Sequence, residues 1–269
     1  MQLIDSHCHL DAPEFDADRE AVLAQARAAG VVAQVLPAVT AASWPGLRAL
    51  CGREPDLFPA YGLHPMFLTE HRREHLDRLQ DWVRREKPVA VGEFGLDFYV
   101  EALDPAEQQH YFEAQLAIAA DAGLPVILHA RRAVEATLIA LKRYRGRLRG
   151  VVHSYAGSSE HARQLFDLGF LLGIGGPVTY PRAQRLRELV STMPIEFLLL
   201  ESDAPDQPLM AHRGQRNLPS RVAEVAACIA ALRDDAFETV AEHCSENARR
   251  LFALPRQDNA DQRPSGLDQ

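Results

Sequence analysis

The sequence has few cysteines, no long apolar run and no excess of positive charge, and each shortage excludes a class of protein. Its four cysteines form no Cys-x-x-Cys pair and are too few in 269 residues for a disulfide framework. No stretch approaches the roughly 18 to 20 consecutive apolar residues that a membrane span needs. The first residues resemble no signal peptide, so we expect a cytoplasmic protein without membrane contact.

Positive charge is scarce across the whole chain. There are 29 Lys and Arg against 37 Asp and Glu, a formal net charge of −8, which argues against a protein that coats nucleic acid through bulk charge. This balance does not exclude an enzyme that brings metal cations to a phosphate group. With 47% hydrophobic and 25% charged residues the composition is that of a globular protein, and the length suits two medium domains or one α/β barrel.

Short apolar runs alternate with longer amphipathic stretches. Such alternation implies a parallel sheet, and eight repeats in about 250 residues predict an α/β protein with one (β/α)8 TIM barrel. A doubly wound open sheet is the rival fold, but no Gly-x-Gly-x-x-Gly follows an early strand to support it. We predict a single domain over residues 1–254 and, because residues 255–269 are polar and aperiodic, a disordered tail. The predicted strands are Leu3–His7, Val31–Leu36, Leu57–Tyr61, Val89–Glu93, Val126–His129, Gly150–His153, Phe170–Ile174 and Phe197–Leu200. The predicted helices are Asp18–Ala29, Leu76–Arg85, Ala106–Ala122, Glu135–Lys142, Glu160–Leu168, Arg182–Val190, Ser220–Leu232 and Ala236–Cys244.

The histidines fall into groups by their position. Five lie in helical patterns with charged neighbours and are predicted to be on solvated helix faces: His71, His75, His110, His161 and His243. Four others end predicted strands: His7, His9, His129 and His153. In a (β/α)8 barrel the carboxyl ends of the strands form the active-site face, so these four are expected to meet there.

Two carboxylates stand at matching places. Glu93 ends a predicted strand, and the alternation of side chains predicts that it points into the barrel together with Val89 and Val91. The same alternation places Asp203 on the same side as Glu201. A buried carboxylate is costly unless it is paired or bound to a metal. One histidine at a strand end is often structural, but four of them with two carboxylates favour a site for two divalent cations.

The motifs around these residues resemble those of the TatD family of metal-dependent hydrolases, within the amidohydrolase-like barrels, from Leu3 to Leu254. They are Ile4-Asp-Ser-His-Cys-His-Leu10, Gly62-Leu-His-Pro65, Val91-Gly-Glu-Phe-Gly-Leu-Asp97, Pro125-Val-Ile-Leu-His-Ala-Arg131, Val152-His-Ser-Tyr-Ala-Gly157, Leu200-Glu-Ser-Asp-Ala-Pro205 and Gly214-Gln-Arg-Asn217. The resemblance implies a deoxyribonuclease-type phosphodiesterase with two divalent metal ions. Departures from the family pattern occur at Phe94, Ser202 and Ser154-Tyr155, none of which is an expected ligand.

The same resemblance assigns the ligands. It implies that one ion is held by His7, His9, Glu93 and Asp203 and the other by Glu93, His129 and His153, with Glu93 bridging. Asp203 and Glu93 are the expected catalytic residues, because the two ions would activate a water that Asp203 orients or deprotonates.

Other polar residues near the predicted strand ends have weaker assignments. Asp5 and Glu201 either hydrogen-bond the histidines or fill a polar layer of the barrel, and His64 and Arg131 are candidate phosphate contacts. A further polar loop contains Arg213, Gln215, Arg216 and Asn217. The basic run Lys142–Arg149 precedes a strand, so we expect it on the opposite barrel face as a solvated loop.

Three functions remain open on the sequence. The first is an exonuclease-like DNase that acts on DNA ends or short single strands. The second is a small-molecule amidohydrolase, lactonase or esterase with the same metals, since fold and metals do not fix the substrate. The third, a non-catalytic binding protein, fits poorly with a complete ligand set. The metal is Zn, Mg or Mn, and no obligatory protein partner is expected.

Overall fold

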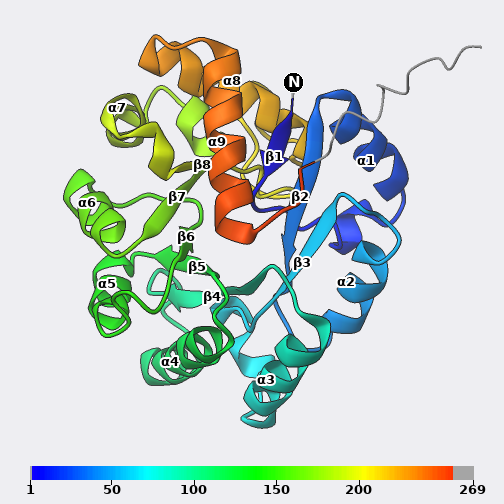
Figure 1. Cartoon of the computed structure of the whole chain (residues 1–269), viewed down its shortest axis with the longest axis vertical. Coiled ribbons are helices and arrows are strands. Elements are labelled where there is room, and N and C mark those ends of the chain that lie inside the picture. The colour runs from blue at the N-terminus through cyan, green and yellow to red at the C-terminus, as the bar shows by residue number, and fades with distance from the viewer. Residues whose placement is uncertain (1, 257–269) are drawn as a thin grey trace, which may run out of the picture.

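The computed structural model describes residues 2–256 and shows the predicted barrel (Figure 1). Its eight strands are parallel to their neighbours and follow one another around the ring in chain order. The amide of Ser6 donates to the carbonyl of Leu200 at 2.9 Å, and that of Asp203 to His7 at 2.9 Å, which joins the ends of the first and last strands. The strands are β1 (Leu3–Asp5), β2 (Val31–Pro37), β3 (Leu57–Tyr61), β4 (Ala90–Asp97), β5 (Val126–Arg131), β6 (Gly150–Val152), β7 (Phe170–Ile174) and β8 (Leu198–Leu200).

Helices surround the ring of strands, as Figure 1 shows. They are α1 (Arg19–Ala28), α2 (Trp44–Cys51), α3 (Glu74–Glu86), α4 (Pro105–Ala122), α5 (Val134–Lys142), α6 (Ser159–Asp167), α7 (Gln184–Thr192), α8 (Val222–Arg233) and α9 (Phe237–Phe252). Short 3₁₀ turns, such as Pro65–Glu70 and Gly176–Thr179, lie in the loops after β3 and β7. No helix among residues 2–256 is long and apolar enough to cross a membrane.

Two helices differ from the sequence prediction. No helix was predicted at α2, where Pro45 and Gly46 directly follow Trp44. Proline is tolerated in the first turn of a helix, where its missing N–H has no partner in any case, and burial of Trp44 and Leu47 stabilises this short helix. α9 runs on to Phe252 instead of ending near Cys244, since its last turn buries Leu251 and Phe252.

The core has two parts. The larger cluster lies between the strands and the helices, and a smaller one collects inward side chains from every strand of the barrel. The end of α9 contributes Leu251 and Phe252 to the smaller cluster, so this apolar layer fills the barrel below the carboxyl ends of the strands. The strand members of the inner layer are Ile4, Ala33, Val35, Ala60, Ala90, Ile127, Val151, Leu171 and Leu199.

Alternation holds for most strands but fails in β4. Ile127, Val151 and Leu199 lie in the inner layer, which gives the inward side to His129, His153 and Glu201 as predicted. In β4 the inner residue is Ala90, whereas Val91 belongs to the helix-facing cluster, so the predicted inward side of Val91 is wrong. The pairing register of β4 with β5 shifts between Val91 and Phe94, and this irregularity turns Glu93 inward.

The disordered tail predicted for residues 255–269 falls mainly on residues 257–269, which lie outside the described residues. The predicted domain limits stay a prediction.

The basic run Lys142–Arg149 spans the end of α5 and the loop before β6. It lies at the barrel end opposite to the carboxyl ends of the strands, as predicted.

Close approach of β4 and β5 requires glycine at position 95. A Cβ added to Gly95 would lie 1.9 Å from the backbone oxygen of His129. We expect Gly95→Ala to lower the free energy of unfolding by about 2 to 3 kcal/mol, because two backbones must separate. Gly46→Ala is the control: a Cβ there meets nothing within 4 Å, and we expect a gain of about 0.5 to 1 kcal/mol. Urea unfolding curves of both variants test this, and equal stabilities would contradict it.

Candidate metal centre

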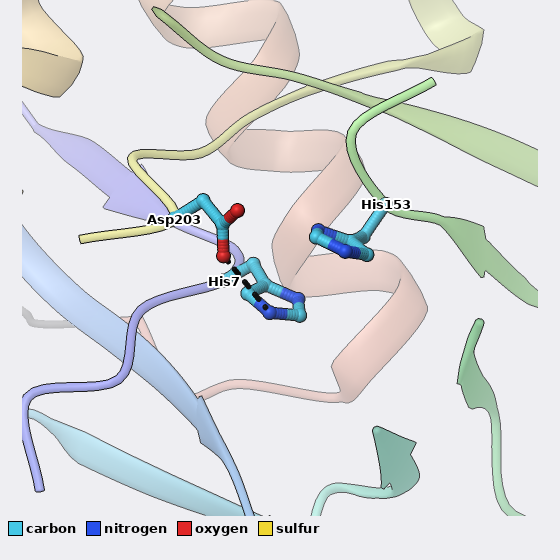
Figure 2. Close-up of side chains that lie close together, drawn as sticks. All are labelled: His7, His153 and Asp203. Atoms are coloured by element: carbon cyan, nitrogen blue, oxygen red, sulfur yellow. Dashed lines mark ion pairs between the residues drawn. The ribbon is translucent and has the colours of Figure 1, made fainter. Parts of the chain in front are cut away.

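Six of the side chains that the sequence singled out converge at the carboxyl ends of the strands. Figure 2 shows three of them, His7, His153 and Asp203, which come from the segments after β1, β6 and β8. All three are buried, and their ligating atoms lie within 4.8 Å of one another. His9 after β1, Glu93 in β4 and His129 in β5 complete the cluster, so the convergence predicted from the strand ends is confirmed.

Glu93 lies at the centre of this cluster with one oxygen toward each side. Its Oε1 is 3.2 Å from His129 Nδ1 and 3.0 Å from His153 Nε2. Its Oε2 is 3.1 Å from His7 Nε2 and 3.6 Å from His9 Nε2. The two carboxylate oxygens therefore divide the four histidines into two pairs, which is the division that the family resemblance implies.

Asp203 faces His7 and His9. Its Oδ1 is 3.6 Å from His7 Nε2 and 3.7 Å from His9 Nε2, while those two nitrogens are only 3.1 Å apart. Two imidazole lone pairs at this separation repel each other unless a proton or a cation lies between them. Imidazole nitrogen and carboxylate oxygen are the donors that bind zinc and similar divalent ions, so the cluster fits a metal site.

Electrostatics also favour positive charge at the centre. Burial opposes the charge of Glu93, but His153, His64 and His7 outweigh it and hold its pKa well below the usual range. Burial likewise opposes the charge of His9, yet its contacts with Glu93 and Asp203 raise its pKa to about 9. Glu93 is therefore a buried anion that draws protons onto its neighbours, and a cation would balance it equally well.

The remaining members respond to burial and to their neighbours. Burial raises the pKa of Asp203 to about 6, and burial together with the proximity of His153 lowers the pKa of His7 well below the usual range. For His153, burial is outweighed by Glu93 and Asp203, and its pKa rises well above the usual range. Protons that bind to this cluster therefore bind to His9 and His153 rather than to His7, which is the most deeply buried of the three.

Asp97 orients His129, and the sequence analysis did not assign it this role. Its Oδ2 is 2.9 Å from His129 Nε2, so a neutral His129 would donate from this nitrogen and leave the lone pair of Nδ1 for a metal ion beside Glu93. Burial works against the charge of Asp97, but the hydrogen bond from His129 and those from backbone amides lower its pKa. The feature that could have identified Asp97 from the sequence is its position at the end of β4, four residues after Glu93.

Asp5 and Glu201 lie directly behind the histidines. The carboxylate of Asp5 accepts hydrogen bonds from the amides of His7 and Ser202 and from Ser202 Oγ, and it makes none to an imidazole. Burial raises its pKa to about 8. Glu201 Oε1 accepts from the amide of Ser154 at 2.6 Å and lies 3.6 Å from His153 Nδ1. Asp5 therefore fixes the backbone that carries His7 rather than its ring.

Gln207 holds the outer oxygen of Asp203. Its amide nitrogen donates to Asp203 Oδ2, and its Oε1 accepts from Ser154 Oγ at 2.8 Å. Both Asp203 and Gln207 have a positive φ, of 55° and 50°, so the loop after β8 turns sharply twice to bring them together. No periodicity marks a loop glutamine, and the sequence analysis did not identify it.

His64 is drawn into the same cluster. Its Nε2 is 3.0 Å from Glu93 Oε1, and its Nδ1 accepts a hydrogen bond from the amide of Met66 at 3.1 Å. Since burial lowers its pKa, the neutral ring carries its proton on Nε2 and donates it to Glu93, leaving no lone pair there for a metal. The predicted contact of His64 with phosphate stays a prediction.

One histidine prediction is wrong. His71 was expected on a solvated helix face, but it is buried after the turn Pro65–Glu70, and its Nε2 lies 2.9 Å from the carbonyl oxygen of His64. His75 is half-buried on α3, where a helix was predicted. Charged neighbours in the sequence did not indicate this burial, because the loop folds back against Tyr111 of α4.

The substrate-side candidates lie apart from one another. Arg131 is exposed at the end of β5, with its guanidinium carbon 3.8 Å from the centre of the Tyr99 ring. In the loop after β8, Arg216 pairs with Asp18 and Asn217 is buried with its amide on the carbonyl of Ser202 at 2.7 Å. These last two therefore stabilise the loop itself.

We expect Asp97→Asn to weaken metal binding by about 10- to 100-fold, the usual effect of removing a carboxylate that orients a histidine ligand. Asp97 Oδ1 accepts from the amides of Tyr99 and Val100, so the oxygen of Asn would stay on these amides. Its NH2 group, a donor, would then face His129 Nε2, where an acceptor is needed. Competition against a chromogenic zinc chelator measures the affinity. Asp167→Asn, an exposed carboxylate on α6, is the matched control, and equal affinities in the two variants would contradict the role of Asp97.

Comparison with known proteins agrees with this geometry. The family described as TatD related DNase matches residues 4–253. YjjV of Escherichia coli K12, named an uncharacterized metal-dependent hydrolase, is 40% identical over 256 residues, covering 94% of this chain and 99% of YjjV. The crystal structure of YjjV aligns with a TM-score of 0.91 over 94% of this chain and 98% of that one.

A relative with a more specific name is the 3'-5' ssDNA/RNA exonuclease TatD of Erwinia tasmaniensis. It is 34% identical over 261 residues, and the match covers 94% of this chain and 100% of the relative. The family match spans nearly all of the described residues, and the barrel and its buried histidine–carboxylate cluster are those expected from the motifs. The chain therefore belongs to the TatD family of metal-dependent hydrolases.

Proposed function

We propose that the protein is a two-metal phosphodiesterase that hydrolyses DNA, acting as an exonuclease on ends or on short single strands. The observation that carries the proposal is the division of the histidines by the two oxygens of Glu93. A carboxylate in this position suits a bridge between two cations, and paired cations suit a phosphodiester, whose cleavage builds negative charge on several oxygens at once.

The donor atoms suggest how the ions would be shared. One would be held by His7, His9, Asp203 and Oε2 of Glu93, and the other by Oε1 of Glu93, His129 Nδ1 and His153 Nε2. The histidines suit zinc, and manganese or magnesium are the alternatives for turnover. Bound divalent cations would supply charge neutralisation at the phosphate and an acidified water.

Asp203 is the residue that we assign to the proton of the attacking water. Its Oδ1 faces His7 and His9, and its Oδ2 faces Gln207. A carboxylate oxygen has two lone pairs, so Oδ2 accepts the amide of Gln207 and still has capacity for a water proton. Gln207 would thereby fix the orientation in which Asp203 receives this proton.

Arg131 is the proposed contact, at the rim, for a backbone phosphate of the bound strand beside the one that is cleaved. It lies two residues beyond His129 on β5, and a guanidinium group can bind two phosphate oxygens at once. His64, 7% exposed and donating to Glu93, would act on the phosphate only through that carboxylate or after a shift of its ring.

The relatives support nucleic acid as the substrate class. The Erwinia relative is named for 3'-5' hydrolysis of single-stranded DNA and RNA, and we propose the same polarity here. The four cysteines are free in the structure, which suits the reducing cytoplasm proposed as the location.

Metal removal should abolish the activity. We expect dialysis against a strong chelator to stop degradation of a 3'-labelled oligonucleotide, and manganese or magnesium to restore it, because no Ser–His or Cys–His pair takes the place of an activated water at the described site. Elemental analysis of the reloaded protein should give two ions per chain. Cleavage by metal-free protein would contradict the proposal, and turnover of esters or lactones but not of oligonucleotides would favour the small-molecule alternative.

Asp203→Asn tests the proton assignment. Asn keeps one oxygen for coordination but accepts the water proton far less readily, so we expect kcat to fall by about 10² or more while KM changes less. Metal content is measured in the same samples, because loss of metal would mimic the effect. His243→Asn, exposed on α9, is the control and should stay near the parental rate. Parental turnover by metal-loaded Asp203→Asn would remove Asp203 from this role.

A further inference from the structure

An aromatic pair is exposed beside the candidate metal centre. Phe98 and Tyr99 follow β4 directly and are 39% and 47% exposed, although large hydrophobic side chains are normally buried. Among the described residues five large hydrophobic side chains are exposed, and four of them lie in loops that follow β3, β4 or β8. Exposed apolar side chains therefore gather on the face that carries the histidines, which indicates contact with a ligand.

Two arginines from the next strand lie against the same ring. The guanidinium carbons of Arg131 and Arg132 are 3.8 Å and 4.7 Å from the centre of the Tyr99 ring. Within residues 2–256 neither guanidinium forms an ion pair or a hydrogen bond. Stacking occupies the face of a guanidinium group and leaves its N–H edge free, so two preoriented positive groups present their donors to solvent.

The backbone ties this group to the metal centre. Asp97, which accepts from His129, also accepts hydrogen bonds from the amides of Tyr99 and Val100 at 2.9 Å and 3.1 Å. The amide of Phe98 donates to the carbonyl of Arg131 at 2.9 Å. Arg131 lies two residues beyond His129 in β5, a step of about 6.6 Å along a strand, which is comparable with the reach of one nucleotide. The turn closed by Asp97 holds Tyr99 against Arg131 in a fixed position.

We propose that Phe98, Tyr99, Arg131 and Arg132 form a binding site for the nucleotide next to the one that is cleaved, a proposal that rests on the nuclease function above. The arginine edges take its phosphate, and the exposed ring of Phe98, over which no guanidinium of the described residues lies, takes its base by stacking. Tyr99 holds the two arginines in position. Stacking on aromatic side chains requires a base with a free face, so the site selects single-stranded nucleic acid over a duplex. In a chain of net charge −8 such a local cationic site supplies the attraction that bulk charge does not.

The ligand class follows from the combination of groups. Arginines alone would suit any anion, and exposed aromatic rings alone would suit any apolar surface. A phosphate linked to a flat base uses both, at the spacing that one strand step provides. Lactone and small ester substrates have neither group.

Binding is measured by fluorescence anisotropy on the full-length, metal-loaded protein. The probe is a labelled hexathymidylate with phosphorothioate linkages, which resist hydrolysis. We expect Phe98→Ala to weaken binding about tenfold, the cost of one lost base–aromatic contact, and Phe98→Tyr to bind within about twofold of the parent, because the ring is retained. Arg131→Ala/Arg132→Ala should weaken binding at least as much and reduce the slope of log K against log salt by about 0.7 per lost phosphate contact.

The matched control removes the same charge elsewhere. Arg145→Ala/Arg147→Ala alters two exposed arginines in the loop before β6, at the opposite end of the barrel, and should leave binding within about twofold of the parent. Equal losses in the two double variants, or parental binding by Phe98→Ala, would overturn the proposed site.

Hydrolysis of bis(p-nitrophenyl) phosphate by the parental protein tests the nuclease chemistry separately, because this diester has no second nucleotide. Hydrolysis of the diester together with binding that does not depend on Phe98 would refute the site and leave the proposed function standing. Binding that depends on Phe98, without any hydrolysis, would refute the function and leave the site.

Discussion

A buried negative charge at Glu93 determines the arrangement of this face of the barrel. A carboxylate that is 2% exposed is unfavourable without compensation, and here imidazole nitrogens from four other strand ends surround it within 3.0 to 3.6 Å. One of its oxygens lies against His7 and His9, and the other lies against His64, His129 and His153. The barrel makes this possible because parallel strands direct all their carboxyl ends to one rim, where side chains distant in sequence meet. Removing the charge would leave these five imidazoles without a common acceptor.

A second set of contacts fixes the groups around Glu93. Asp97 selects the tautomer of His129, Asp5 holds the backbone of His7 against Ser202, and Gln207 holds Asp203. Each contact joins the end of one strand to the end of another or to the loop that follows it. Orientation is therefore built into the closure of the barrel, and the donors need little rearrangement to bind a cation. The same contacts place the exposed Tyr99, since Asp97 serves His129 and the loop after β4 together.

Much of this was predictable from the sequence because strand ends are readable. The alternation of apolar runs and helices predicts eight repeats, and histidines at the ends of those runs converge in the structure. What escaped prediction depends on loops and irregularities. β4 turns Glu93 inward through a register shift that strict alternation does not contain, and Val91 was consequently misplaced. His71 was assigned to solvent from its charged neighbours, although the turn after β3 buries it against His64. Gln207 reaches Asp203 through two residues with positive φ, a conformation that no periodic pattern encodes.

The distribution of charge connects the metal centre with its proposed substrate. A protein with a net charge of −8 repels a polyanion at long range, so attraction must come from groups close to the reacting bond. Cations bound by the histidines would supply part of it, and arginines held on an aromatic ring supply the remainder without competing carboxylates. Because such attraction acts over about a Debye length, it favours short flexible strands that bring one or two phosphates into the site. Under the proposed function, rigid duplex DNA would bring many more phosphates toward this negatively charged protein, so the same charge balance would favour a strand end over internal binding to a duplex.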